Sequence, residues 1–177
     1  NEKILIIGAT GFIGYHLAKK CIKMGWLVTS FSKNKPKQIR RINKIKYVYG
    51  DIFIKKSLKK IDKEFDYVVN LGGYVDHSNY SSGGDKVFDV HFNGTKNLIN
   101  CINKDSLRSF IQIGSSDEYG SNSAPQNENQ RELPMSPYSC AKTAATYFLQ
   151  MLNRTENFPA VILRPFLVYG PGQDKNR

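Results

Sequence analysis

The sequence predicts an α/β fold in which helices cover both faces of a doubly wound parallel sheet of about six strands. Along the 177 residues, short apolar runs rich in β-branched side chains alternate with segments of helical spacing. The first apolar run, residues 3–7, leads into a glycine-rich turn and then into a helical pattern. This order is typical of a nucleotide-binding βαβ unit.

The expected strands are apolar runs that end at glycine or polar residues, and the expected helices carry apolar residues at three- and four-residue spacing. Strands are expected at 3–7, 27–31, 47–49, 66–71, 110–114 and 160–163. Helices are expected at 12–24, 54–61, 85–103 and 137–153, with a polar loop at 121–135.

The turn at residues 8–14 reads Gly-Ala-Thr-Gly-Phe-Ile-Gly. Such a turn lets the backbone approach a pyrophosphate, and the helix N-terminus adds unpaired N–H groups and a favourable dipole. The spacing differs from the Gly-x-Gly-x-x-Gly of many dehydrogenases, and an ordinary turn is the alternative. The position between strand and helix favours a dinucleotide site. Its predicted residues are Gly8, Gly11, Phe12, Ile13 and Gly14.

The end of the second strand lacks the acidic residue that usually holds the ribose hydroxyls of NAD. It reads Ser32-Lys33-Asn34-Lys35 instead. No carboxylate repels a 2′-phosphate there, and the lysines attract one. Ser32 and Lys33 are therefore predicted to contact the cofactor, with a slight preference for NADP over NAD. A solvated basic loop is the alternative.

The composition excludes several classes of protein. The formal charge is +11, but the basic residues gather at 33–46 and 55–63 without an aromatic platform or groove-reading motif. We expect a lysine-rich surface that attracts anionic ligands, not a nucleic-acid partner. No apolar run is long enough to cross a bilayer, and we expect a protein without a signal peptide. Cys21, Cys101 and Cys140 are dispersed without metal spacing, which predicts a reduced, cytoplasmic protein.

Three side chains are predicted to meet beyond the carboxyl ends of the strands. Ser115 follows the fifth strand, and Tyr138 and Lys142 lie one turn apart on the next helix. A free tyrosine has a pKa near ~10, and a neighbouring cation favours its ionised form. The spacing predicts proton transfer at a hydroxyl-bearing carbon. An exposed helix face is the alternative, but the Ser-Pro start of the helix favours a site.

Two further positions have open interpretations. Asp51 follows a strand, so it is predicted to accept a hydrogen bond from adenine, to cap a helix, or both. Gly94 inside a helix costs about 1 kcal/mol relative to alanine, which indicates close packing beside Asn93 against the sheet or the cofactor. His77 and His91 lack metal-ligand spacing, and His91 is given no role.

These segments together resemble the extended short-chain dehydrogenase/reductase family, in particular its nucleotide-sugar epimerases and 4,6-dehydratases. The resemblance covers nearly the whole chain. Its segments are 8–14, Gly50-Asp51, 71–73, 93–95, 115–120, 138–142 and 164–172. It implies a Rossmann-type domain, a tightly held NAD or NADP, and transient oxidation of a hydroxyl on a nucleotide-diphosphate sugar.

The resemblance also implies roles for single residues. Tyr138 is the base, Lys142 tunes it and anchors the ribose, and Ser115 holds the substrate hydroxyl. The remaining implied cofactor contacts are Asp51, Ile52, Leu71, Gly72, Gly73, Asn93, Tyr138, Lys142 and Pro165. A homodimer through helices 85–103 and 137–153 is expected. A reductase of a non-sugar ketone or alcohol, or a non-catalytic dinucleotide-binding module, remains an alternative.

Two departures from the family limit the assignment. Counting back from Tyr119-Gly120 makes Ser115 the catalytic hydroxyl and Asp117 an acid where some dehydratases carry glutamate. Reading residues 116–118 as the dehydratase triplet leaves one residue missing, so we prefer the first register. The chain also stops at Arg177, whereas family members continue into a substrate domain. We expect residues 1–177 to be an inactive dinucleotide-binding domain, with 167–177 as the junction toward an absent domain.

Overall fold

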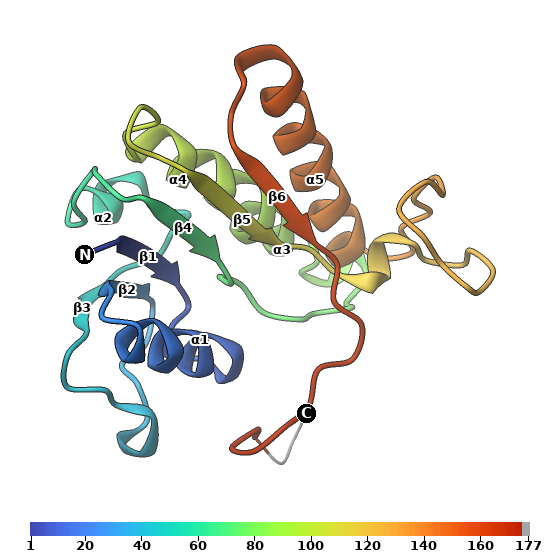
Figure 1. Ribbon diagram of the computed structural model, residues 1–177. Coiled ribbons are helices and arrows are strands. Elements are labelled where there is room, and N and C mark those ends of the chain that lie inside the picture. Colours follow the sequence, from blue (N-terminus) through green and yellow to red (C-terminus); the bar gives the residue numbers. More distant parts are fainter. Residues whose placement is uncertain (175–177) are drawn as a thin grey trace.

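The computed structural model, which describes residues 1–174, contains a six-stranded parallel sheet in the order β3-β2-β1-β4-β5-β6 (Figure 1). The strands are β1 (Lys3–Ile7), β2 (Leu27–Ser32), β3 (Lys46–Tyr49), β4 (Tyr67–Asn70), β5 (Ser109–Ile113) and β6 (Ala160–Leu163). All five neighbouring pairs are parallel. The strand order reverses direction at β1, so the crevice expected for a ligand lies beyond the ends of β1 and β4.

The helices follow the strands as the sequence predicts, with differences in length. They are α1 (Phe12–Lys23), α2 (Lys55–Leu58), α3 (Asp85–Phe88), α4 (Gly94–Cys101) and α5 (Pro137–Glu156). Shorter turns are η1 (Gln38–Arg40), η2 (Tyr80–Ser82), η3 (Asp89–Asn93, a π-helical turn) and η4 (Ser116–Glu118).

Two of the expected helices differ from the prediction. The helix expected at 54–61 is a single turn. Leu58 at the end of this turn and Ile61 in the loop after it are both buried in the core, so a longer helix is not needed to bury them. The helix expected at 85–103 contains the π-helical turn η3 between α3 and α4. Such turns are rare and mark positions where tertiary contacts override the regular helix.

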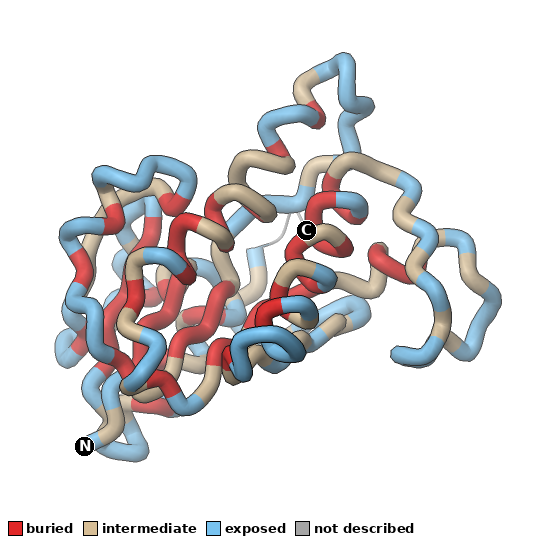
Figure 2. Tube along the Cα trace, turned by 90° about the horizontal axis from the view of Figure 1, so that it is seen from above, coloured by how far each residue is buried: buried red, intermediate tan, exposed pale blue. Residues whose placement is uncertain are grey.

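Helices cover both faces of the sheet, because alternate residues of each strand point to opposite sides. Ile4 and Ile6 of β1 pack in a cluster with Ala18 and Cys21 of α1. The buried members of this cluster are Ile4, Ile6, Ala9, Ala18, Cys21, Val28, Ile45 and Val69. Leu5 of β1 belongs to the other cluster, with residues of α2, α4 and α5. The buried strands run through the middle of the molecule in Figure 2.

The start of α5 is fixed by Ser136, whose side-chain oxygen accepts a hydrogen bond of 3.1 Å from the backbone N–H of Ser139. Pro137 follows as the first helical residue, where its missing N–H costs nothing. This confirms the helix start that the Ser-Pro pair predicts. It also places Tyr138 in the first turn, close to the sheet.

The segment after β6 leaves the sheet and crosses toward α1 (Figure 1). Its apolar residues Phe166, Leu167 and Val168 are 60%, 92% and 40% exposed. Further on, the backbone carbonyl of Pro171 lies 3.0 Å from Nε2 of His16 on α1. Residues 175–177 of the expected junction lie outside the described residues.

Candidate active site at the carboxyl ends of the strands

The glycine turn after β1 has the geometry of a pyrophosphate cradle. Gly8 has a φ of 84°, and its N–H donates to the carbonyl of Phe31 at 2.9 Å. A Cβ on Gly14 would lie 2.2 Å from the carbonyl oxygen of Gly8, so only glycine lets α1 approach the turn. A Cβ on Gly11 would meet only that same oxygen, at 3.3 Å. The space above Gly11 is therefore open for a ligand.

The N-terminus of α1 is free to bind an anion. Gly11 is its N-cap and supplies no side-chain hydrogen bond to the first turn. Phe12 and Ile13 form this first turn, and Ile13 is 38% exposed. Unpaired backbone N–H groups and the helix dipole favour a phosphate at such a terminus. The predicted cradle residues are thus brought together.

The segment after β4 lies beside the cradle. A Cβ on Gly8 would be 3.1 Å from the carbonyl oxygen of Leu71, whose N–H donates to Ile7 at 3.0 Å. A Cβ on Gly72 would be 2.7 Å from the side chain of Ile7. Leu71 and Gly72 therefore lie against β1, where the sequence places a cofactor contact.

Asp51, Lys33 and Ser32 lie together at the ends of β2 and β3. Oδ2 of Asp51 is 3.3 Å from Nζ of Lys33, and Oδ1 accepts a hydrogen bond of 3.1 Å from the N–H of Phe53. Asp51 therefore stabilises the turn after β3 but does not cap a helix, because the N-cap residue of α2 is Ile54 and no side chain caps that helix. Ser32 is buried, with its Oγ 3.3 Å from Oγ of Ser30. The ammonium of Lys33 is therefore paired with the carboxylate of Asp51.

Gly94 packs closely, as predicted, but against a side chain and not against a strand. A Cβ there would lie 2.5 Å from Cγ1 of Ile52, which follows β3. The side-chain amide of Asn93 donates to Oδ1 of Asp89 at 3.1 Å, within the same π-helical turn. The amide is therefore engaged with its own helix.

Lys142 and Tyr138 occupy one buried face of α5. Nζ of Lys142 donates a hydrogen bond of 2.8 Å to the carbonyl of Ile113, the last residue of β5, and lies 5.7 Å from the centre of the Tyr138 ring. Burial lowers the pKa of Lys142 to about 8, and the negative charge of Glu118 partly opposes this. The helix face is buried, which rules out the solvent-exposed alternative.

Ser115 lies two residues beyond Ile113 and begins η4. Its Oγ accepts a hydrogen bond of 3.1 Å from the N–H of Asp117. The strand end thus delivers the hydroxyl to the side of the sheet where Lys142 contacts Ile113. The structure brings the predicted serine, tyrosine and lysine to one end of the sheet.

His91 was missed by the sequence analysis, although it packs against Tyr138 with ring centres 5.1 Å apart. Nε2 lies 2.8 Å from the carbonyl of Tyr74, so this nitrogen carries the proton. Nδ1 is the one buried side-chain polar atom without a hydrogen-bond partner among residues 1–174. Burial, followed by the charge of Lys142, lowers the pKa of His91 to about 3.

Gly73 explains how His91 enters the site. Gly73 has a φ of 129°, and a Cβ there would lie 2.1 Å from Cε1 of His91. The glycine therefore makes room for the imidazole. Gly73 and His91 are separated in the sequence by a loop and by α3, so no local pattern predicts their contact. The one available signal was that His91 lies three residues before Gly94, on the helix expected to pack closely.

A cavity of about 540 Å³ opens next to Tyr138. It is lined by His77, Ser116, Asp117, Gly120, Ser121, Gln126, Met135, Ser136, Ser139 and Phe166. Nε2 of His77 is 3.7 Å from Oδ2 of Asp117, and the His77 ring meets the Tyr138 ring edge-on at 5.6 Å. This cavity therefore lies beside the Tyr138 ring and the segment that follows β5.

The two acids after Ser115 have different environments. Glu118 is fully buried, and its carboxylate accepts hydrogen bonds from Arg164 and Thr146 at 2.9 and 2.8 Å. The Asp117 side chain is 39% exposed and lines the cavity. An acid that acts on a leaving group must reach the substrate, and of these two acids only Asp117 lines the cavity.

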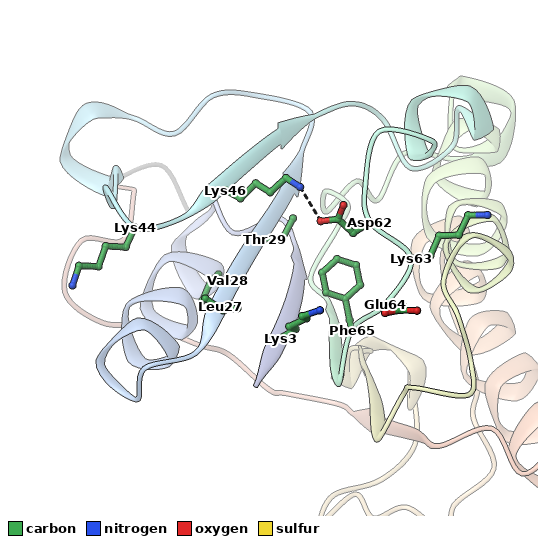
Figure 3. A pocket seen from close by; sticks show the side chains of 10 residues that line it. All are labelled: Lys3, Leu27, Val28, Thr29, Lys44, Lys46, Asp62, Lys63, Glu64 and Phe65. Atoms are coloured by element: carbon green, nitrogen blue, oxygen red, sulfur yellow. Dashed lines mark hydrogen bonds and ion pairs between the residues drawn. The ribbon is translucent and has the colours of Figure 1, made fainter. Parts of the chain in front are cut away.

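A second hollow of about 630 Å³ lies at the opposite, amino ends of β1–β3 (Figure 3). It is lined by Lys3, Leu27, Val28, Thr29, Lys44, Lys46, Asp62, Lys63, Glu64 and Phe65. In Figure 3, Lys44 and Lys63 point away from each other, and Lys46 pairs with Asp62 at 2.8 Å. The charges do not converge on one ligand position, so this hollow is not the active site.

Within residues 1–174, no group of histidine, cysteine or acidic side chains is arranged to hold a metal ion. In the same part of the chain, no helix has the length and apolar character needed to span a bilayer. The cysteines are free, and Cys21 is buried.

A parallel sheet with a glycine cradle at its switch point, and a serine, tyrosine and lysine beside it, defines a dinucleotide-binding α/β protein. Residues 4–177 match the NAD dependent epimerase/dehydratase family. The chain belongs to this family.

Relatives in the family include sugar-modifying enzymes. The chain is 29% identical to a dTDP-D-glucose 4,6-dehydratase of Dictyostelium discoideum, over 97% of this chain and 45% of that protein. It is 29% identical to a putative UDP-glucose 4-epimerase of Methanocaldococcus jannaschii, over 97% and 57%. The chain thus spans about half the length of the curated relatives it matches.

Solved structures agree with the fold. A UDP-glucuronic acid 4-epimerase from Bacillus cereus, in complex with NAD, superposes with a TM-score of 0.84 at 26% identity, over 99% of this chain and 59% of that chain. A UDP-glucose 4-epimerase from Thermotoga maritima, with UDP-glucose, gives a TM-score of 0.88 at 25% identity, over 97% and 58%.

Proposed function

We propose that this chain is the cofactor-binding and catalytic part of an NAD(P)-dependent nucleotide-diphosphate-sugar epimerase or 4,6-dehydratase. The observation that carries the proposal is the buried pair of Tyr138 and Lys142, at the same end of the sheet as Ser115 and the glycine cradle. The family match and its sugar-modifying relatives support it.

The residues present fit a nicotinamide dinucleotide. The open space at Gly11 and the uncapped N-terminus of α1 suit a pyrophosphate. Asp51 and Lys33 lie where the adenosine end would bind, and Pro165 lies at the end of β6, where its carbonyl accepts from the N–H of Ser116 at 3.2 Å. When bound, the cofactor supplies a reversible hydride acceptor. Its binding to solved relatives supports this assignment.

Proton transfer is the task of the chain's own residues. The ionised phenolate of Tyr138 would accept the proton of the sugar hydroxyl that is oxidised, and the phenol so formed would return a proton when the ketone is reduced. The Lys142 ammonium favours the ionised phenol, as an opposite charge nearby does. Ser115 holds the same hydroxyl by a hydrogen bond. Burial of Tyr138 and Lys142 keeps water away and strengthens these interactions.

Several finer properties belong to the same proposal. We propose a slight preference for NADP, supported by the lysine at position 33 and the lack of an acid at the end of β2. A homodimer is proposed, with the exposed Tyr147 and Met151 of α5 available for its interface. A cytoplasmic location is supported by the free cysteines. A reductase of a non-sugar carbonyl remains the second candidate, since the Ser115–Tyr138–Lys142 set suits it equally.

The test is Tyr138→Phe in the protein extended to the full length of its relatives. Turnover of UDP-glucose or dTDP-glucose should fall on the order of 10²- to 10⁴-fold, because the transferable proton is lost. Calorimetric affinity for NAD should stay unchanged. Tyr67→Phe, at the start of β4 and therefore at the opposite end of the sheet, should keep full turnover. Full activity of Tyr138→Phe would overturn the mechanism.

A further inference from the structure

Glu118 is completely buried beneath the site, where an unpaired carboxylate would be very costly. Oε1 accepts a hydrogen bond of 2.9 Å from the backbone N–H of Ser115. Oε2 accepts from Oγ1 of Thr146 at 2.8 Å and from Nε of Arg164 at 2.9 Å. Both oxygens of the carboxylate are therefore bonded.

These bonds tie together three parts of the chain that form the site. Ser115 follows β5, Thr146 belongs to α5, and Arg164 follows β6. A Cβ on Gly114 would lie 2.3 Å from Oε1, so the glycine before Ser115 lets the carboxylate reach the backbone. Thr146 lies one turn beyond Lys142 on α5. Glu118 is thus placed to fix the catalytic serine relative to the catalytic helix.

Glu118 also supplies negative charge to Lys142. Burial disfavours the charged ammonium, and among the groups around it Glu118 is the one that favours it. The other groups facing the ammonium are the Ile113 carbonyl on β5, the Tyr138 ring on α5, and His91 on η3, which burial keeps neutral. Arg164, from the end of β6, is paired with Glu118 and Glu132.

We propose that Glu118 is a positioning residue of this site: it fixes the Ser115 backbone and, bonded to Thr146 one turn beyond Lys142, places a negative charge beside Lys142. The inference rests on the proposed roles of Ser115, Tyr138 and Lys142. It assigns the second acid after Ser115 to a task different from that of Asp117. Asp117 faces the cavity, whereas Glu118 acts from beneath through two other residues.

The charge on Lys142 can be measured in this chain without cofactor or turnover. NMR titration of the Lys142 side chain should give a pKa of about 8 for the unaltered protein. In Glu118→Gln, the pKa should fall by about one unit or more, because the favourable charge is removed. A loosened structure would act in the opposite direction, since water entering the site raises the pKa toward its ordinary value.

Control variants separate charge from packing. Thr146→Val removes one hydrogen bond to the same carboxylate and leaves its charge, so the Lys142 pKa should not fall. If Glu118→Gln does not fold, the pair Glu118→Gln with Arg164→Gln replaces both buried charges by amides, and a smaller fall is expected because loss of the Arg164 cation raises the pKa of Lys142. In either variant the Ser115 amide should exchange with solvent faster than in the unaltered protein.

The outcomes are distinct from those of the proposed function. An unchanged or raised Lys142 pKa in both glutamine variants would overturn the role of Glu118, whatever the protein catalyses. A lowered pKa with faster Ser115 exchange would support it, even if Tyr138→Phe of the extended protein kept full activity. Full activity of Tyr138→Phe would count against the proposed role of Tyr138 in catalysis, and not against the role of Glu118.

Discussion

The ammonium group of Lys142 donates a hydrogen bond of 2.8 Å to the carbonyl oxygen of Ile113, at the point where β5 ends. This hydrogen bond holds α5 against the end of β5, although the polar loop at 121–135 separates the two in the sequence. The ammonium that makes this bond is buried, and burial lowers the pKa of Lys142 to about 8. Such a buried cation must make folding depend on pH.

The first prediction concerns alkaline pH. Between pH 8 and 10.5, the unfolded chain keeps the Lys142 proton and the folded chain loses it. Stability therefore rises through this window, and the penalty of burying the charge is fully present below it. The unfolding free energy of the unaltered protein should rise by about 3 kcal/mol relative to that of Lys142→Met across the window. Urea titrations at several pH values measure it, and a constant difference would contradict the buried charge.

The second prediction concerns acid. His91 is neutral in the folded protein, and its pKa of about 3 lies below the ordinary value of 6.5. Below pH 6.5 the unfolded chain binds a proton that the folded chain does not, so stability falls as pH falls toward 3. The loss should reach about 3 kcal/mol near pH ~4. His91→Gln should abolish this component, whereas a variant of exposed His77 should retain it.

The extent to which the sequence predicts this site depends on the range of the interaction. The cradle is local: strand, turn and helix follow one another, and Gly8 and Gly14 meet within a few residues. Lys142 and Tyr138 share a helix face by spacing alone. The contact of His91 with Gly73 and the bonds from Glu118 to Thr146 and Arg164 join distant segments. No local pattern encodes such partners, and the same tertiary packing produces the π-helical turn.

The third prediction separates the two roles of glycine in the cradle. Gly11→Ala should lower the melting temperature much less than Gly14→Ala, because its Cβ meets a single atom at 3.3 Å. It should still weaken NAD binding by about tenfold or more, since the methyl group occupies the space for the pyrophosphate. Gly14→Ala places a Cβ 2.2 Å from backbone, so it should cost about 1–3 kcal/mol of stability or more. Calorimetry and thermal unfolding distinguish them, and equal NAD affinity in Gly11→Ala would refute the cradle.

The fourth prediction addresses cofactor choice. Lys33 is exposed and paired with Asp51 at 3.3 Å, so a 2′-phosphate must compete with this carboxylate. An exposed ion pair contributes about 0.2–1 kcal/mol, which predicts a preference for NADP of no more than about fivefold at low salt. Salt should weaken the preference, and Lys33→Gln should remove it. Lys35→Gln, at an exposed neighbouring lysine, should not. Equal affinities of the unaltered chain for NAD and NADP at low salt would rule the preference out.

The last prediction distinguishes a dehydratase from an epimerase. Asp117 lines the cavity next to Tyr138 and lies 3.7 Å from His77. If the extended protein is a dehydratase, Asp117→Asn should block loss of water while oxidation of the sugar continues, because the acid serves the leaving hydroxyl and not the hydride step. If it is an epimerase, the same change should matter little.

The measurement is NMR analysis of the products formed from dTDP-glucose and UDP-glucose, with cofactor reduction followed by absorbance in the same samples. Ser115→Ala is the matched comparison, since it should slow both steps on the order of 10²-fold by disturbing the hydroxyl that is oxidised. Equal losses of oxidation and elimination in Asp117→Asn would instead assign Asp117 to holding the substrate, because a group that binds every state affects both steps alike.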